Sequence, residues 1–252
     1  MLKTDNISKY YDEKAVVEGV SVEIPKGRIT SFIGSNGAGK STLLSIISRL
    51  IKQSGGNVYL EGTPITDIAD SELAKRVSIL KQSSHVNIRL TVRELVSFGR
   101  FPYSGGRLTK EDEETVSRAI GYMDLESSEN KYIDTLSGGQ RQRAFIAMII
   151  AQDTDYVLLD EPLNNLDMKH SVQIMKTLRR LTDELGKTVV LVIHDINFAS
   201  CYSDYIAALK DGKLAGFGTV DEMIEGGILR DVFGMEFDVR EMNGSRICLY
   251  YT

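Results

Sequence analysis

The sequence predicts an α/β fold: a mostly parallel sheet with an N-terminal antiparallel β-subdomain and an inserted α-helical subdomain. Three observations carry this prediction. A glycine-rich loop at residues 34–42 lies between an apolar strand and an apolar helix, buried-type strands recur near residues 156–159 and 189–193, and strand-like alternation disappears across residues 83–150. Apolar strands without alternation suit a parallel sheet that is covered on both faces.

This pattern divides the 252 residues into one domain with three parts. We expect an α/β core at residues 1–82 and 151–219, a helical lobe at residues 83–150, and a short C-terminal extension at residues 220–252. The extension is too small to be an independent regulatory domain.

Residues 1–30 alternate as β-strands do, which predicts an antiparallel sheet beside the strand at residues 29–33. Tyr10-Tyr11-Asp12 reads as a turn within it. A tyrosine there packs in the core, lies at the surface, or stacks on an adenine ring. The residues alone favour packing.

The glycine-rich loop fits the phosphate-binding pattern G-x-x-x-x-G-K-[ST] over Gly34, Ser35, Asn36, Gly37, Ala38, Gly39, Lys40, Ser41 and Thr42. Its glycines let backbone N–H groups surround phosphate oxygens, and the following helix adds the positive end of its dipole. Lys40 would reach the β- and γ-phosphates, and the Ser41 hydroxyl would bind Mg²⁺. A plain glycine turn is the alternative, but the strand before the loop and the helix after it are what a P-loop requires. We therefore expect a P-loop NTPase core that binds ATP and Mg²⁺.

The chain then continues with a strand near residues 58–62, a helix from Ser71, and a short apolar strand at residues 77–80 that leads to Gln82. Most glutamines at such a place are solvated loop residues. Taken alone, Gln82 is weak evidence for a site.

Two capping boxes predict helix starts in the lobe. Thr91 is followed three residues later by Glu94, and Thr109 by Asp112. An aromatic, glycine-rich link at residues 98–106 joins the two helices. These features favour a helical lobe inserted into the core.

The second half of the core alternates again between strands and helices. We expect a strand at residues 156–159, a long helix at 168–185, and a buried strand at 189–193. Asp211-Gly212 predicts a tight hairpin turn, and Asn243-Gly244 predicts a terminal one.

Polar side chains follow the two apolar strands at 156–159 and 189–193. Asp160 is suited to hold Mg²⁺, and Glu161 to orient or deprotonate the attacking water. A solvated acidic turn is the alternative, and the P-loop makes it the weaker one. His194 follows the second strand; a lone histidine is usually structural, but here it lies where it can contact the γ-phosphate or the attacking water.

A second phosphate cradle precedes the helix at residues 141–151. Ser137, Gly138, Gly139 and Gln140 present a hydroxyl, backbone N–H groups and a helix N-terminus. A Ser-Gly-Gly helix start without a ligand is the alternative. One ATP site has no use for a second cradle, whereas a symmetric dimer has, because each cradle closes on the ATP of the other subunit.

Composition excludes several classes of protein. The charged and hydrophobic fractions are those of a globular chain, and the net charge of −5 disfavours an electrostatic grip on nucleic acid. Two cysteines are too few for a disulfide framework, which favours a reducing compartment. The first six residues lack the apolar core of a signal peptide, and the longest apolar run, 144–151, is too short to span a membrane. Any transport role would need a separate membrane partner.

The order of these motifs resembles that of ATP-binding cassette (ABC) ATPases. The resemblance covers residues 1–220 and rests on the P-loop, Gln82, residues 136–140, Asp160-Glu161, residues 165–167 and His194. It implies that Tyr11 stacks on adenine, which reverses the preference above, and that Gln82 binds Mg²⁺ and communicates with the membrane partner. Asp167 resembles the residue that crosses the dimer interface, and His194 the switch histidine.

Within this family the chain resembles ATPases of ferric-siderophore, haem and vitamin B12 importers, on residues 98–103 and 194–199 and on its short C-terminus. Residues 161–170 are most similar to the siderophore branch, and within it to the catecholate type. One departure is Leu163-Asn164, where many members have Thr-Ser; we expect it to leave the catalytic residues intact.

The resemblance implies a peripheral ATPase on the cytoplasmic face of the membrane, acting as a homodimer on an integral membrane permease. The permease surface is expected near Gln82 and residues 83–105. An extracellular siderophore-binding lipoprotein or periplasmic protein would deliver the cargo. The rivals are the ATPase of an exporter, a soluble cassette ATPase acting on DNA or ribosomes, and a nucleotide-binding regulator without turnover. The chain has neither the second cassette nor the long coiled coil usual in the soluble class, and Asp160 and Glu161 disfavour the regulator.

Overall fold

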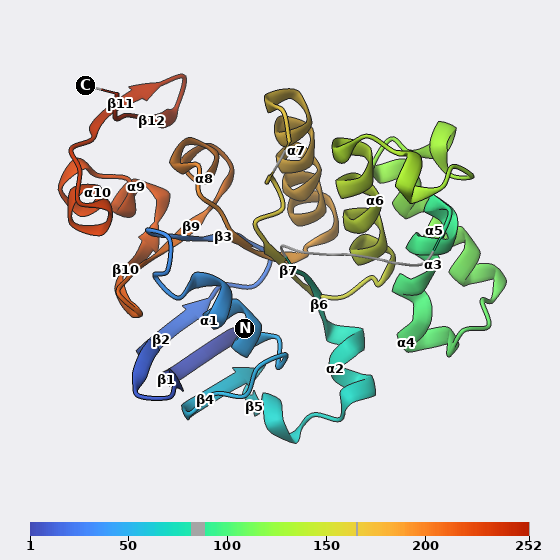
Figure 1. Cartoon of the computed structure of the whole chain (residues 1–252), viewed down its shortest axis with the longest axis horizontal. Helices are drawn as coiled ribbons and strands as arrows, with labels where there is room; N and C mark the ends of the chain where they lie inside the picture. Colours follow the sequence, from blue (N-terminus) through green and yellow to red (C-terminus); the bar gives the residue numbers. More distant parts are fainter. Residues whose placement is uncertain (82–88, 165, 252) are drawn as a thin grey trace.

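A six-stranded sheet crosses the middle of the molecule in the computed structural model, which describes residues 1–81, 89–164 and 166–251 (Figure 1). Its strand order is β10-β9-β3-β8-β7-β6, and all neighbours are parallel except the β9–β10 hairpin. The strands are β3 (Ile29–Ile33), β6 (Val77–Leu80), β7 (Tyr156–Asp160), β8 (Thr188–Val192), β9 (Tyr205–Lys210) and β10 (Lys213–Thr219). Every residue of β3, β7 and β8 is buried, which confirms the prediction of a doubly covered parallel sheet.

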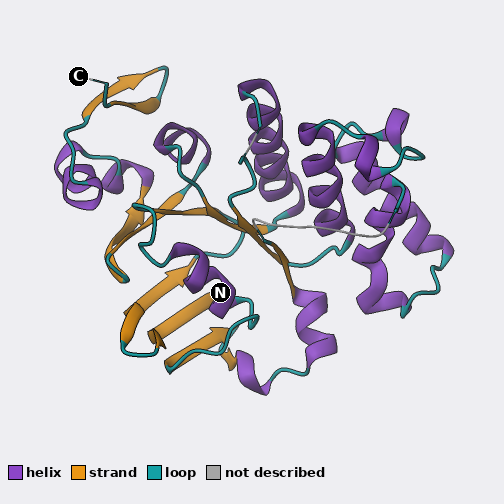
Figure 2. Ribbon diagram, viewed as in Figure 1, coloured by secondary structure: helices purple, strands orange, loops and turns teal. Residues whose placement is uncertain are grey.

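The antiparallel subdomain packs below this sheet together with α1 (Lys40–Ile47) (Figure 2). Its strand order is β2-β1-β4-β5. The strands are β1 (Leu2–Tyr11), β2 (Lys14–Ile24), β4 (Gly55–Leu60) and β5 (Thr63–Pro64). Tyr10 and Tyr11 belong to β1, so the predicted turn begins later, at Asp12. After β5, helix α2 (Asp70–Arg76) begins one residue before the predicted start and leads into β6.

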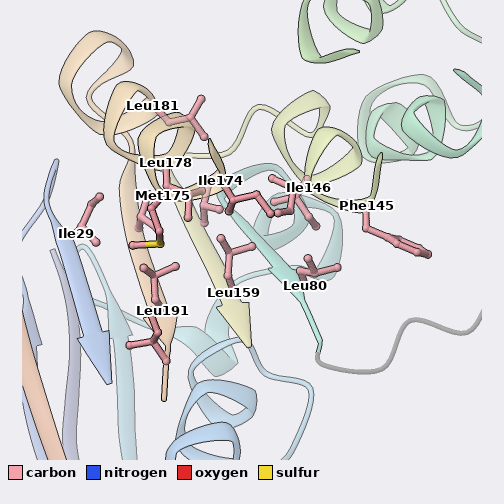
Figure 3. Packing of buried hydrophobic residues seen from close by; sticks show 14 of the residues in the cluster. Ile29, Leu80, Phe145, Ile146, Leu159, Ile174, Met175, Leu178, Leu181 and Leu191 are labelled. Carbon is pink, nitrogen blue, oxygen red and sulfur yellow. The ribbon is translucent and has the colours of Figure 1, made fainter. Parts of the chain in front are cut away.

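Helices cover the opposite face of the sheet. They are α6 (Gly138–Ala151), α7 (Met168–Leu185) and α8 (Ile196–Tyr202). Figure 3 shows Ile174, Met175 and Leu178 of α7 among the side chains of Leu159 and Leu191, which come from β7 and β8. The face of the sheet opposite the antiparallel subdomain is therefore covered by a continuous apolar layer.

The helical elements between residues 92 and 151 lie at the β6 side of the sheet (Figure 1). Besides α6 they are α3 (Val92–Ser97), α4 (Phe101–Ser104), α5 (Lys110–Tyr122) and 3₁₀ turns at Phe98–Arg100, Glu126–Ser128 and Ile133–Thr135. Both predicted capping boxes, at Thr91 and Thr109, are present. The buried apolar side chains of these helices belong to the same cluster as those of α7 and as Val157 and Leu159 of β7. The division of the chain into core, lobe and extension stays a prediction.

The link at residues 98–106 attaches these helices to the C-terminal end of α6. A Cβ on Gly99 would stand 2.2 Å from the carbonyl O of Met148, so only glycine permits this approach. Arg100 donates to the carbonyl O of Ala151 at 2.9 Å and to the Asp112 carboxylate at 2.8 Å. The link therefore ties α5 and α6 together.

The chain ends in α9 (Val220–Met223), α10 (Gly226–Phe233) and a hairpin of β11 (Asp238–Met242) and β12 (Ser245–Leu249). This hairpin and the β9–β10 hairpin turn at the predicted Asn-Gly and Asp-Gly pairs. The Asn197 side chain of α8 bonds both the backbone N–H and the carbonyl O of Cys248. In the described part of the chain, none of the helices combines the length and apolar character needed to cross a bilayer.

Candidate active site

The P-loop leaves β3 and enters α1, as its sequence predicts. Two of its glycines are required by close contacts. A Cβ on Gly34 would stand 2.1 Å from the carbonyl O of Leu209, and one on Gly39 would stand 2.5 Å from that of Val16. Both glycines also have positive φ, at 140° and 95°. The loop, Val16, Glu161 and His194 line a hollow of about 160 Å³.

Lys40 points into its own loop. Its side-chain ammonium donates to the carbonyl O of Gly34 at 2.7 Å and to that of Ser35 at 2.9 Å, and the residue is only 4% exposed. Burial lowers the pKa of Lys40, and the nearby carboxylates of Glu161 and Asp160 oppose that effect. A phosphate in the loop would supply the negative charge that this buried cation lacks.

Asp160 ends β7 directly beside the P-loop. Ser41 Oγ donates to Asp160 Oδ1 at 2.7 Å. Burial raises the pKa of Asp160, and the hydrogen bond from Ser41 works in the opposite direction. A cation next to this pair would offset the cost of burying the negative charge of the carboxylate. A hydroxyl and a carboxylate are oxygen ligands of the kind that Mg²⁺ prefers.

Glu161 and His194 are brought together from the ends of β7 and β8. His194 Nε2 lies 2.7 Å from Glu161 Oε1, and Asn164 donates to the other carboxylate oxygen, Oε2. The Glu161 side chain is 10% exposed and that of His194 is 39% exposed. Glu161 has a positive φ of 52°, a sparsely populated conformation that turns the carboxylate at the end of the strand.

The second cradle is already formed as the first turn of α6, and the described hydrogen bonds of its Ser137 side chain stay within that turn. Ser137 is the N-cap of α6, and its hydroxyl accepts the backbone N–H of Gln140, whose side chain returns to the Ser137 N–H. Ser137 and Gly138 are exposed and Gly139 is buried. The helix begins at Gly138 rather than at Arg141, so the glycines belong to its first turn.

Two predicted site residues, Tyr11 and Asp167, have described contacts with residues other than the P-loop. Tyr11 is 48% exposed and stacks under Lys9, so the preference for core packing was wrong. Asp167 is the N-cap of α7 and accepts from the backbone and ring of His170. Gln82 lies outside the described residues.

Leu163-Asn164 is the one departure from the family pattern, and the Asn164 amide contacts Glu161. That the departure leaves the catalytic residues intact stays a prediction. The sequence motifs did not identify two further residues near the site. His170 lies against Gly139, and Gln142 donates to the carbonyl O of Pro162 at 3.0 Å. No spacing rule marks such contacts, since they join residues from separate elements.

The family model for the ABC transporter matches residues 17–164 of the chain. A relative from Bacillus subtilis (strain 168), the petrobactin import ATP-binding protein YclP, is 60% identical over 252 residues, with 100% of both chains covered. The petrobactin import ATP-binding protein FatE of Bacillus anthracis is 52% identical, with 95% of this chain and 96% of that protein covered.

Among solved structures, the dimeric ABC transporter cassette MJ0796 superimposes with a TM-score of 0.79 at 33% identity, covering 87% of this chain and 99% of the other. The same cassette has been solved with ADP and phosphate in a post-hydrolysis state.

Proposed function

This chain belongs to the ABC transporter family, and we propose that it is the ATPase subunit of an importer for iron–siderophore complexes. It would act on the cytoplasmic face of the membrane as a homodimer bound to a separate membrane permease. The observation that carries this proposal is the cluster of Lys40, Ser41, Asp160, Glu161 and His194, together with the relatedness to import ATP-binding proteins.

Magnesium would be held by Ser41 and Asp160 together with phosphate oxygens of ATP. Among the described residues no three His, Cys, Asp or Glu side chains gather to form a metal site, so nucleotide and metal are expected to bind together. Bound Mg²⁺ would neutralise charge on the β- and γ-phosphates. Gln82 and Tyr11 stay proposed contacts to the metal and the adenine.

Glu161 would take a proton from the water that attacks the γ-phosphate. Its carboxylate lies beside the P-loop hollow, and His194 and Asn164 contact its two oxygens. These contacts orient the carboxylate before ATP binds. The proton would therefore move to a base that is already placed.

A homodimer would bring the second cradle to the ATP. Ser137 and Gly138 are exposed, and no contact of the Ser137 hydroxyl with the P-loop occurs within the described residues. The dimeric state of the MJ0796 cassette supports the same arrangement here. Each ATP would then lie between Lys40 of one copy and residues 137–140 of the other, with Asp167 at the same interface.

The permease would dock in an apolar groove of about 460 Å³ beside α3 and α4. Leu90, Phe98, Phe101 and Leu108 contribute its apolar lining, and Phe98 and Phe101 are 52% and 60% exposed. Rings this exposed are expected to be covered by another chain. Arg100, between them, reaches the C-terminal end of α6, whose other end carries Ser137. Movement of the permease would thus be transmitted along α6 to the second cradle.

The cargo is proposed from the relatives, because cargo contacts belong to the permease and to an extracellular binding protein. YclP and FatE are named for import of petrobactin, so a ferric siderophore of that type is the first to test. The catecholate type stays a prediction.

The test is uptake of ⁵⁵Fe-labelled petrobactin by cells that lack this chain, complemented with wild type, Glu161→Gln or Phe98→Ala/Phe101→Ala. We expect rescue by wild type alone. Phe98→Ala/Phe101→Ala should keep ATP hydrolysis by the purified subunit and lose copurification with the permease. Full uptake without this chain would contradict the cargo, and export of labelled siderophore instead of uptake would favour the exporter alternative.

A further inference from the structure

The first turns of α6 are held at two points, one in the segment that follows β7 and one in the first turn of α7. Gln142 donates to the carbonyl O of Pro162, and Gly139 lies against the ring of His170. A Cβ on Gly139 would stand 3.0 Å from His170 Cγ and 3.1 Å from Nδ1. The second glycine of the cradle and this imidazole are therefore in direct contact, and a larger residue at 139 would displace the ring.

Asp167 fixes the orientation of that ring. Its Oδ1 accepts the backbone N–H of His170 at 2.9 Å, and its Oδ2 lies 2.8 Å from Nδ1. These hydrogen bonds lower the pKa of Asp167, so the carboxylate is ionised at neutral pH and accepts only. Nδ1 therefore carries the hydrogen in this contact. The ring cannot rotate without breaking it.

Asp167, His170 and Gly139 thus form a row that runs inward from the exposed side chain of Asp167 to the buried Gly139. The His170 side chain is 27% exposed and that of Asp167 is 64% exposed. In the proposed dimer, Asp167 at one end faces the second copy, as do the exposed Ser137 and Gly138, which directly precede Gly139 at the other end. The imidazole sets the distance between them, because it contacts Asp167 through Nδ1 and Gly139 through its ring atoms.

We infer that His170 is a positioning residue for ATP-driven dimer closure, whose ring, fixed by Asp167, holds Gly139 and the cradle where they fit the ATP of the second copy. The inference rests on the proposed homodimer. It concerns closure and not nucleotide capture, because the described contacts of His170 do not include the P-loop.

The test combines His170→Ala with Glu161→Gln, which blocks turnover, and follows ATP-driven dimerisation by sedimentation. We expect half-maximal dimer formation to need about tenfold more ATP, a change typical of neighbours in one hydrogen-bonded network. Affinity for fluorescent ADP, which is expected to need no contact with the second copy, should change less than about twofold. Lys176→Ala, an exposed substitution on the same helix, is the matched control and should change neither.

His170→Asn separates the two contacts of the ring. Its amide can still donate to Asp167, but it presents no ring to Gly139, so we expect it to keep the closure defect. Wild-type closure in His170→Asn would overturn the inference. Failure of Glu161→Gln alone to dimerise with ATP would contradict the proposed dimer as well as the inference. If Glu161→Gln dimerises and His170→Ala does not change the ATP concentration required, only the inference is contradicted.

A double-mutant cycle with Gly139→Ala tests the contact itself. In the presence of His170 the new Cβ collides with the ring, whereas His170→Ala leaves room for it. The penalty of Gly139→Ala on closure should therefore shrink in the His170→Ala background. Additive penalties would show that the glycine and the ring act separately, and would overturn the inference.

Discussion

The P-loop cluster and the second cradle differ in how their polar groups are satisfied. At the P-loop, side chains from the start of α1 and from the ends of β7 and β8 have partners within the chain. Lys40 donates to the loop, Ser41 to Asp160, and Glu161 contacts His194. At the cradle, the Ser137 hydroxyl accepts only from the first turn of its own helix among the described contacts. One site is assembled within the chain, and the other presents its donors outward.

This difference indicates where a second copy is required. Helix N-termini are anion sites only when an anion is brought to them. We therefore propose that the P-loop captures nucleotide in a single chain and that the cradle reaches a phosphate only when a second copy docks. Changes at the P-loop cluster should therefore affect capture or chemistry, and changes at the cradle should affect closure.

The largest expected effect is on chemistry. Glu161→Gln removes the proposed base, and loss of general-base catalysis should lower kcat by about 10²–10⁴-fold. Because Lys40 and Ser137 are unchanged, ATP should still bind and the dimer should stay closed. Steady-state phosphate release and sedimentation with ATP measure the two effects. Glu111→Gln, an exposed substitution on α5, is the control. Turnover near that of wild type would remove Glu161 from its role.

The next effect is confined to the helical region. Asp112 is 6% exposed at its side chain and pairs with Arg100 at 2.8 Å. Asp112→Asn leaves the buried guanidinium uncompensated, which should cost about 3 kcal/mol of unfolding free energy at neutral pH. Urea unfolding followed by circular dichroism measures this cost, and the P-loop affinity for ADP should be unaltered in the folded variant.

This cost should depend on pH with a defined sign. The Thr109 backbone N–H, and then Arg100, hold the pKa of Asp112 below its usual value of 3.8. A lowered folded-state pKa gives stability that is fully present above pH 3.8 and lost as pH falls through the folded value. The gap between wild type and Asp112→Asn should therefore be constant near neutrality and shrink below about pH 4. A gap that persists in acid would contradict the charged pair.

A paired comparison separates capture from closure. Lys40→Ala removes a charged donor to phosphate and should weaken fluorescent ADP binding by about 10- to 100-fold. Ser137→Ala should leave ADP binding unchanged and raise the ATP needed for dimerisation of the Glu161→Gln form. Ser137 also caps α6, so Thr91→Ala, which removes the cap of α3, is the matched control. Equal effects of Ser137→Ala and Thr91→Ala on the ATP needed for dimerisation would mean that Ser137 acts only as a helix cap.

The sequence predicts the architecture well where local rules determine it. Unalternating apolar runs gave the buried strands, and the boxes at Thr91 and Thr109 start helices as expected. The approach of Lys40, Ser41 and Asp160 also follows, because the ends of parallel strands meet at one sheet edge. These features need only spacing and pattern.

Contacts between separate elements could not be predicted in this way. The ring of His170 on Gly139 does not follow from a motif, since it depends on the packing of α7 against α6. The amide of Asn164 reaches Glu161 within one loop, but that contact depends on the loop conformation and on a rotamer. Tyr11 shows the same limit: alternation placed it near a strand, but which face it occupies depends on the register of β1. Exposure at 48% leaves its ring accessible, as stacking on an adenine would require.

The smallest expected effect lies at the junction of the two sites. Asn164 follows β7 closely and donates to Glu161, while His194 contacts the other carboxylate oxygen. Asn164→Ser places the residue that many family members have there, and the shorter side chain loses the bond. Since one hydrogen bond orients only part of the carboxylate, kcat should fall by about threefold, with KM for ATP unchanged. The same substitution at the exposed Asn243, in the terminal hairpin, is the control. A changed KM would mean that Asn164 acts on the P-loop rather than on the base, and an unchanged kcat would mean that the Asn164 amide is not needed to orient Glu161.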